Sequence, residues 1–169
     1  KEQGLKVPFI RPLELATDEA NTRDVILHAL DYYNNLNNEI PELIILLQPT
    51  SPLRKPEQIK EALKLFTPDI DMIVSVKESE SNPYYTLFEE NSDGFLKISK
   101  EGGYTRRQDC PSVWELNGAI YVMNTRSVIE KKISEFDKIV KYEMDTISSI
   151  DIDNELDWAI SEMFIKNYR

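Results

Sequence analysis

Cysteine and histidine are almost missing from the 169-residue sequence, which has one of each. A lone Cys110 excludes an internal disulfide and a cysteine-based zinc site, and it is consistent with a reducing compartment, for which the cytoplasm is the default expectation. His28 lies beside the apolar stripe of an expected helix, where histidine usually has a structural role. Neither a histidine-based metal site nor a histidine-dependent catalytic triad is therefore expected.

Long apolar runs and an excess of positive charge are missing too. No stretch approaches the roughly 20 apolar residues that a membrane-spanning helix requires, so no membrane partner is expected. The formal net charge of −10 argues against nucleic acid as a partner, because nucleic-acid binding depends on basic surface. An anionic small molecule would need local arginines or a divalent cation to meet its charge.

The apolar residues that are present predict an α/β fold. Their 41% share of 169 residues fits one domain with a sizeable core. Leu43–Leu47 is an unbroken apolar run, typical of a strand buried on both faces of a parallel sheet, and residues 72–76 form a second short run. Residues 56–66 between them have one apolar face and predict a helix. This order forms a βαβ unit, so we expect a mostly parallel sheet.

Further elements are predicted on both sides of this unit. A helix is expected from an N-cap at Thr17 or Asp18 to about Leu36. Extended segments are expected at residues 117–123 and 138–144, and helices at 125–132 and after Asp153. Gly118, near the start of the strand at 117–123, permits a close approach of the backbone.

Residues 82–111 form an insertion that is rich in turn formers and aromatics. Short strands at 84–89 and 95–99, joined by a turn at residues 92–94, predict a hairpin. Such a hairpin cannot bury side chains like Phe88 and Phe95 on itself. We expect it to contact a second subunit, and a flap folded over the domain's own sheet is the alternative.

The loop after the first strand, residues 48–54, is the central candidate for ligand binding. Its two prolines exclude helix and restrict the residues before them, so the loop is expected to be stiff. Ligands of open α/β sheets bind beyond the carboxyl ends of the strands, where this loop would lie. A turn that merely caps the next helix is the better account of Ser51 alone, whereas the Gln48 amide needs a partner. We interpret the loop as the floor of a small-molecule site.

Positive charge is concentrated around Arg106 and Arg107. Residues 97–107 contain four cations and one anion in a chain of net charge −10. Two arginines after the flexible Gly102-Gly103 pair suit phosphate or carboxylate oxygens, although a solvated basic turn is about as common. Arg11 could be held rigidly between two proline-restricted positions, and a surface arginine in a linker is the alternative.

Asp151 and Asp153 form the candidate metal site. At strand periodicity their carboxylates share one face, and two like charges at close range are costly unless a cation lies between them. Hard oxygen ligands, few in number, suit Mg²⁺, which keeps waters and is completed by substrate phosphates. Asp153 could instead be the N-cap of the following helix, or do both.

Four ordered motifs together resemble the acylneuraminate cytidylyltransferase family. They read RPLELATDEANTRDV, LLQPTSPLR, RRQDCP followed by NGAIYV, and SIDIDNELD, and the match extends from Pro8 to Trp158. The resemblance implies a Rossmann-like mononucleotide-binding α/β fold. It also implies an enzyme that transfers CMP from CTP to the anomeric hydroxyl of a nine-carbon 2-keto sugar acid and releases pyrophosphate.

The resemblance assigns a role to each matched position. It implies nucleotide contacts at Arg11 and Thr22, substrate contacts at Gln48, Thr50, Ser51, Gln108 and Asn117, catalytic roles for Arg106, Arg107 and Asp151, and Mg²⁺ ligands at Asp151 and Asp153. The arginines would hold sugar carboxylate or phosphate oxygens and stabilise the departing pyrophosphate. The hairpin region resembles the family's dimerisation element, which implies a homodimer.

The family pattern departs from this sequence at the beginning. The family starts with a strand and a loop around the CTP phosphates, and neither precedes Lys1. We therefore expect residues 1–169 to be one nucleotidyltransferase domain truncated at its N-terminus, with an exposed sheet edge. If the polypeptide were complete as given, we would expect it to bind CTP poorly and not to turn over. The alternatives are another sugar nucleotidyltransferase, or a catalytically incomplete fragment that only binds or dimerises. The sequence does not indicate which sugar acid is the substrate.

Overall fold

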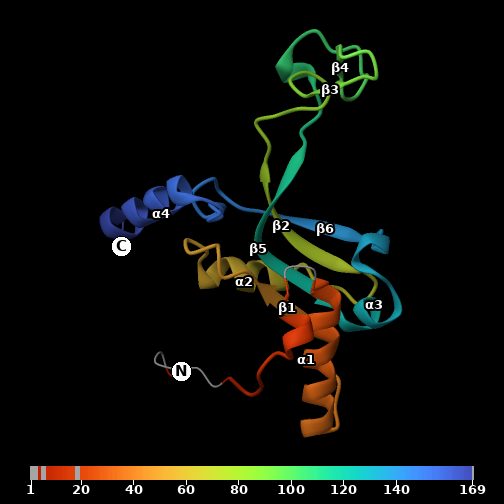
Figure 1. Cartoon of the computed structure of the whole chain (residues 1–169), viewed down its shortest axis with the longest axis vertical. Coiled ribbons are helices and arrows are strands. Elements are labelled where there is room, and N and C mark those ends of the chain that lie inside the picture. Colours follow the sequence, from red (N-terminus) through yellow and green to blue (C-terminus); the bar gives the residue numbers. More distant parts are fainter. Residues whose placement is uncertain (1–3, 5–6, 18–19, 169) are drawn as a thin grey trace.

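The computed structural model describes residues 4, 7–17 and 20–168, and the predicted α/β class is confirmed. Within these ranges a four-stranded sheet has the order β1-β5-β2-β6 (Figure 1). The strands are β1 (Leu43–Leu47), β2 (Met72–Glu78), β5 (Trp114–Asn124) and β6 (Ile139–Glu143). The α-helices are α1 (Thr22–Asn37), α2 (Pro56–Leu63), α3 (Thr125–Glu130) and α4 (Glu155–Tyr168).

The sheet is mixed, which corrects the prediction of a mostly parallel sheet. β5 runs antiparallel to both β1 and β2, and β2 is parallel to β6. β1 and β2 therefore point the same way, as the βαβ reading requires, but β5 lies between them. The chain leaves β2, passes through the insertion and returns along β2 as β5, and such a return produces antiparallel pairing.

β1 lies at an edge of the described sheet. Its exposure alternates, and the side chains of Ile45 and Leu47 are 39% and 37% exposed. The prediction of a strand buried on both faces is therefore wrong for β1, because the face that carries Ile45 and Leu47 is only partly covered. That description fits β2 instead, where residues 72–76 are all buried.

Two apolar cores lie on the two faces of the sheet, because alternate residues of a strand point to opposite faces. Met72, Val74 and Val76 of β2 join Ile26 and Leu30 of α1 in one core. In the other core, Ile73 packs with Ala62 of α2 and with residues of β5 and β6. The sheet is thereby covered by α1 on one face and by α2 on the other.

α1 begins later than predicted. Its N-cap is Asn21, whose Oδ1 accepts a hydrogen bond from the backbone N–H of Arg23. Thr17 lies in a bend after a 3-10 turn at Leu13–Leu15, so it does not cap the helix, and Asp18 lies outside the described residues. The 3-10 turn lies between the extended segment that starts at Val7 and the first residue of α1, Thr22.

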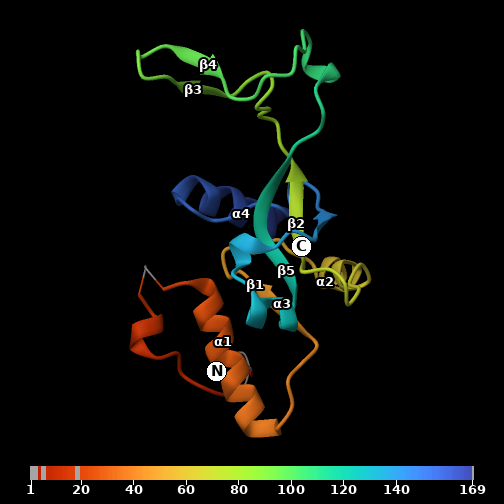
Figure 2. The same cartoon turned by 90° about the vertical axis from the view of Figure 1, so that its right-hand side faces the viewer.

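The predicted hairpin is confirmed and stands on an arm. β2 and β5 continue beyond the body of the sheet to the pair formed by Glu78 and Trp114. Beyond it lie β3 (Phe88–Glu90) and β4 (Leu96–Ile98), which pair antiparallel and are shorter than predicted. Figures 1 and 2 show this hairpin standing away from the four-stranded sheet, so it is no flap over that sheet.

In the part of the chain that the structure describes, no helix has the length and apolar character that crossing a membrane requires.

Candidate active site

A cavity of about 540 Å³ lies where the arm leaves the sheet, and it brings together three predicted site residues. Asn117 reaches it from β5, and Asp151 and Asp153 reach it from the loop between β6 and α4. This loop is irregular, whereas the alternation of its residues predicted a strand. The two carboxylates nevertheless line the same cavity.

Asp151 has an unusual setting for a carboxylate. Its Oδ1 is buried and has no hydrogen-bond partner among the described residues. Its Oδ2 lies against the backbone of β5, only 3.0 Å from the place where a Cβ on Gly118 would be. An unpaired buried carboxylate oxygen is costly, so the geometry favours a cation or a donor from a ligand at this point.

Asp153 is exposed and does not cap α4. The cap is Asn154, whose Oδ1 accepts from the backbone N–H groups of Leu156 and Asp157 at 2.9 and 3.1 Å. Asp157 in turn accepts from the N–H groups of Asp153 and Asn154 through its Oδ2. The side chain of Asp153 is thus left for another role, and the alternative role as N-cap belongs to its neighbour.

The donor set is small. Among the residues that the structure describes, no three His, Cys, Asp or Glu side chains gather closely enough to hold a metal ion by themselves. Two carboxylates at the rim of a wide cavity suit Mg²⁺ better than a fully protein-bound ion, because Mg²⁺ keeps waters and shares phosphate ligands. The residues present therefore fit the predicted metal.

Asn117 is buried at the centre of a polar network. Its Oδ1 accepts from the Ser75 hydroxyl at 2.5 Å and from the Ala119 N–H, and its Nδ2 donates to the Ser149 hydroxyl at 2.9 Å. The Ser75 hydroxyl also accepts from the N–H of Ile120. Both ends of the amide are thus bonded within the protein. Asn117 connects β2 and β5 to the loop that carries Asp151.

The strand is irregular at this point. The pairing of β2 with β5 shifts its register between Val74 and Val76, whose partners are Tyr121 and Leu116. Gly118 lies in this irregular stretch with φ +71°, a backbone conformation that residues with a side chain rarely adopt. Such irregularities often turn a side chain toward a functional site, and here the cavity begins.

The loop at residues 48–54 is fastened to β5 and to the loop that carries Asp151 and Asp153. Nη1 of Arg54 donates to the carbonyls of Gln48 at 3.0 Å and Ala119 at 2.8 Å, and its burial lowers the pKa of Arg54. The N–H of Ile152, between the two aspartates, donates to the carbonyl of Thr50 at 2.9 Å. The stiff loop predicted from the prolines therefore lies beside the Asp151 loop.

Individual side chains of this loop differ in exposure. Ser51 is buried and its hydroxyl has no hydrogen-bond partner among the described residues, whereas Gln48 and Thr50 are half-buried. The buried hydroxyl of Ser51 is therefore not the helix cap that the alternative reading proposed. The N–H of Lys55 at the start of α2 instead donates to the side chain of Gln58.

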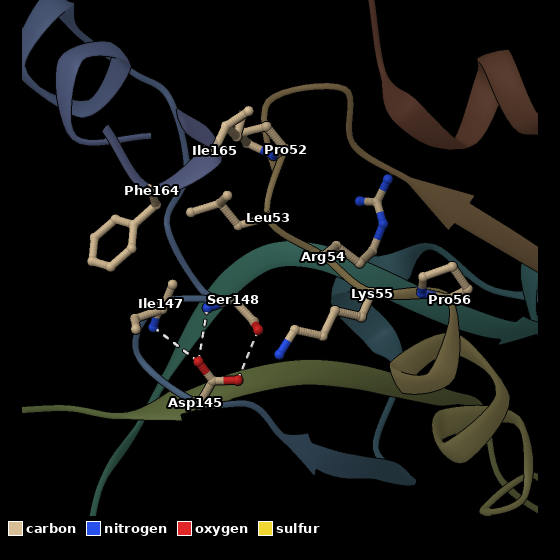
Figure 3. A pocket seen from close by; sticks show the side chains of 10 residues that line it. All are labelled: Pro52, Leu53, Arg54, Lys55, Pro56, Asp145, Ile147, Ser148, Phe164 and Ile165. Carbon is tan, nitrogen blue, oxygen red and sulfur yellow. Dashed lines mark hydrogen bonds between the residues drawn. The ribbon is translucent and has the colours of Figure 1, made fainter. Parts of the chain in front are cut away.

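A second cavity, of about 380 Å³, lies between residues 52–56 and α4 (Figure 3). At its floor Asp145 accepts from the N–H of Ile147 and from the N–H and hydroxyl of Ser148. Burial would raise the pKa of Asp145, but these bonds outweigh it and lower the pKa. Asp145 therefore holds the turn that precedes Ser149 and Asp151.

Arg106, Arg107 and Gln108 lie outside the Asp151 cavity. Arg106 is exposed and holds both oxygens of Asp109 at 2.8 and 2.9 Å. Arg107 donates to the carbonyl of Glu80, and with Gln108 it lines a neighbouring cavity of about 560 Å³. The two cavities meet at Thr146, which lines both.

The predicted nucleotide contacts are not among the residues that line the Asp151 cavity. Arg11 is exposed in the segment before the 3-10 turn, and Thr22 is the exposed first residue of α1.

Two residues near the site escaped the sequence reasoning. Lys77 lines the cavity and pairs with Glu115 at 3.2 Å. Its signal was a cation directly after the buried run of β2. Tyr121 is the second, since burial and then the charge of Asp151 raise its pKa. Nothing local marks Tyr121, because its proximity to Asp151 depends on how β5 meets the distant loop.

Known proteins similar to this chain extend along nearly all of it. The chain is 33% identical to an N-acylneuraminate cytidylyltransferase of Streptococcus agalactiae, over 93% of this chain and 37% of that protein. It is 28% identical to a CMP-N,N'-diacetyllegionaminic acid synthase of Legionella pneumophila, over 98% and 71% of the two chains. It is 31% identical to the post-translational flagellin modification protein B of Campylobacter coli, over 96% and 69%. No family model matches the chain.

The chain thus spans 37% of the length of the streptococcal relative. Among solved structures, it resembles a 4-diphosphocytidyl-2C-methyl-D-erythritol synthase from Anaerococcus prevotii with a TM-score of 0.58, over 87% of this chain and 65% of that one. The sequence identity is 11%, so this likeness concerns the fold alone.

Proposed function

Since this chain belongs to the acylneuraminate cytidylyltransferase family, we propose that it functions in the transfer of CMP from CTP to the anomeric hydroxyl of a nine-carbon 2-keto sugar acid, with release of pyrophosphate. The observation that carries the proposal is the buried Oδ1 of Asp151, which has no hydrogen-bond partner among the described residues and lies in a cavity that Asp153 also lines. An anionic oxygen in that setting calls for a cation, and a nucleoside triphosphate is bound together with one.

Asp151 and Asp153 would hold Mg²⁺. When bound, the ion would screen the charge of the α-phosphate and lower the pKa of the attacking hydroxyl. Asp151 contributes an oxygen whose position is set by the backbone of β5, and Asp153 contributes one from the exposed approach to α4. The difference in burial gives the two carboxylates different roles. The buried carboxylate of Asp151 would fix the position of the ion, and the exposed carboxylate of Asp153 would adjust when the substrate binds.

The loop at residues 48–54 would form the wall that faces the sugar. Gln48, Thr50 and Ser51 are its proposed contacts, and the buried hydroxyl of Ser51 still lacks a hydrogen-bond partner among the described residues. The hydrogen bonds of Arg54 keep this wall at a constant distance from β5. Arg11 and Thr22 would contact the nucleotide.

Arg106 and Arg107 would meet the negative charge of the substrates. Arg106 can exchange Asp109 for a phosphate or carboxylate oxygen at little cost, because an exposed ion pair contributes little free energy. Arg107 and Gln108 already line the cavity that adjoins the Asp151 cavity at Thr146. A bound substrate that spans both cavities would bring the arginines and the aspartates into one site.

A homodimer is part of the proposal. The hairpin presents apolar side chains to solvent, among them Phe95, which is 71% exposed, and Leu96, which is 69% exposed. A contiguous exposed apolar surface on a projecting element is typical of a protein contact. A second copy of the chain is its proposed partner.

Pyrophosphate release with CTP, Mg²⁺ and a panel of 2-keto sugar acids tests the function. We expect release with at least one nine-carbon acid, and a loss of about 100-fold or more in Asp151→Asn, because the neutral amide is a poor metal ligand. Asp31→Asn, at an exposed position of α1, makes the same chemical change away from the site and should retain activity. Equal rates for the two variants would contradict the role of Asp151, and release with a different nucleotide or sugar class would point to another nucleotidyltransferase.

A further inference from the structure

We propose that Gly118, Asn117 and Ser149 are positioning residues that fix the Asp151 carboxylate for a divalent cation. The inference rests on the proposed function and concerns the same site. Gly118 would act by having no side chain. Asn117 and Ser149 would act through the hydrogen bond that connects β5 to the loop carrying Asp151.

The first step is the space above Gly118. A Cβ built on this residue meets Oδ2 of Asp151 at 3.0 Å and its Cγ at 3.7 Å, so a side chain here would press on the carboxylate and oblige it to shift. Oδ2 is held against the backbone, while Oδ1 is left buried without a hydrogen-bond partner among the described residues. The carboxylate therefore presents one defined oxygen.

The second step is the loop itself, which is fastened on both sides of Asp151. Two residues before it, the Ser149 hydroxyl accepts from Nδ2 of Asn117 at 2.9 Å, in a buried position. One residue after it, the N–H of Ile152 donates to the carbonyl of Thr50 at 2.9 Å. With both flanks fixed, the backbone of Asp151 cannot move away from Gly118 without breaking a hydrogen bond.

The third step is the position of Asn117 in the core. Its Oδ1 is held by Ser75 of β2, and Ser75 is fully buried. Hydrogen bonds thus connect Ser75 of β2 through Asn117 to Ser149 in the loop that carries Asp151. Groups that orient metal ligands in this way change metal affinity by about 10- to 100-fold when they are altered.

Two variants test the proposal, each with a matched control. Gly118→Ala places a methyl group against Asp151 in a strained backbone, and Gly4→Ala imposes similar strain at φ +77° where nothing lies within 4 Å. Ser149→Ala removes the acceptor of Asn117, and Ser161→Ala removes a buried hydroxyl that has no partner among the described residues. Far-UV circular dichroism establishes that each variant folds.

The measurement is binding of Mn²⁺, a hard divalent stand-in for Mg²⁺, to the whole chain with CTP, followed by electron paramagnetic resonance of the free ion. We expect Gly118→Ala and Ser149→Ala to weaken Mn²⁺ binding about 10-fold or more, and Gly4→Ala and Ser161→Ala to bind as the parent does. If Gly118→Ala does not fold, Ser149→Ala decides.

Asp151→Asn separates this inference from the function on which it rests. If Asp151→Asn loses Mn²⁺ binding while folded Gly118→Ala and Ser149→Ala bind normally, the positioning role is overturned and the metal site stands. If the parent does not bind Mn²⁺, or if Asp151→Asn binds it as the parent does, the metal site and the positioning role both fall.

Discussion

The Asp151 cavity and the projecting arm are built in opposite ways. Around Asp151, buried side chains such as Asn117 and Ser75 connect strands and loop through hydrogen bonds. On the arm, Arg106 is bonded to its near neighbour Asp109 in an exposed segment, and the aromatic residue Phe95 faces solvent. The polar groups around Asp151 are bonded to one another within the chain. The groups on the arm are exposed and can contact a substrate or a second subunit.

The difference indicates how labour is divided in the proposed site. A metal ligand must be held in place before substrate arrives, because its geometry decides metal affinity. Residues that clamp an anionic substrate or a second subunit can be ordered when that partner binds. The cost of ordering them then falls at the moment of binding.

The body of the sheet should respond most strongly to a change at Asp71. This side chain is 4% exposed and accepts from the Ser127 hydroxyl at 2.6 Å and from the N–H groups of Asp137 and Lys138 at 3.2 and 3.1 Å. Asp71→Ala should lower the free energy of unfolding by about 3 kcal/mol, because these donors lose their acceptor in a buried place. Urea denaturation measures the change.

Asp69→Ala, at an exposed position nearby, should leave the urea midpoint almost unchanged. The dependence of stability on pH provides a second test of the role of Asp71. The hydrogen bond from Ser127, followed by that from Lys138, holds the pKa of Asp71 below its usual range. Its contribution is therefore complete above the ordinary Asp pKa of about 3.9 and is lost as the pH falls from there toward the lowered pKa. An Asp71→Ala chain with the same acid sensitivity as the parent would contradict this account.

A change at Arg54, which connects the loop at residues 48–54 to β5, should lower the free energy of unfolding by less than the change at Asp71 does. Arg54→Lys keeps the charge but not the geometry that reaches the carbonyls of Gln48 and Ala119. We expect a loss of about 1–2 kcal/mol in the free energy of unfolding. We also expect a higher KM for the sugar acid with kcat less affected, because the proposed role of the loop is to position the substrate. Thermal unfolding and steady-state kinetics measure both. A lower stability with an unchanged KM would separate the loop from substrate binding.

The hairpin should show the smallest effect on the stability of the chain and the clearest effect on assembly. Phe95→Asp places a charge on the proposed contact and should convert the dimer to monomer, with the free energy of unfolding of the monomer changed by less than about 0.5 kcal/mol. Light scattering after size exclusion measures the mass. Leu36→Asp, at the 67% exposed Leu36 near the end of α1, is the matched control. A parent that is monomeric at all concentrations would end the dimer proposal.

Local signals predicted the elements well and their arrangement less well. The apolar runs located β1 and β2, and the turn residues located the hairpin, because these patterns involve neighbours in sequence. The insertion of β5 between β1 and β2 escaped, since the order of strands depends on contacts between distant segments. For the same reason β1 was expected to be buried on both faces, whereas Ile45 and Leu47 are partly exposed.

The site divides in the same way. The spacing of Asp151 and Asp153, and the stiffness of the loop with two prolines, are properties of the sequence by itself. That the Cβ missing from Gly118 makes room for Asp151, and that Asn117 holds Ser149, was decided only by the tertiary structure. The orientation of a carboxylate depends on the groups that surround it, and the groups around Asp151 come from strands far away in the chain.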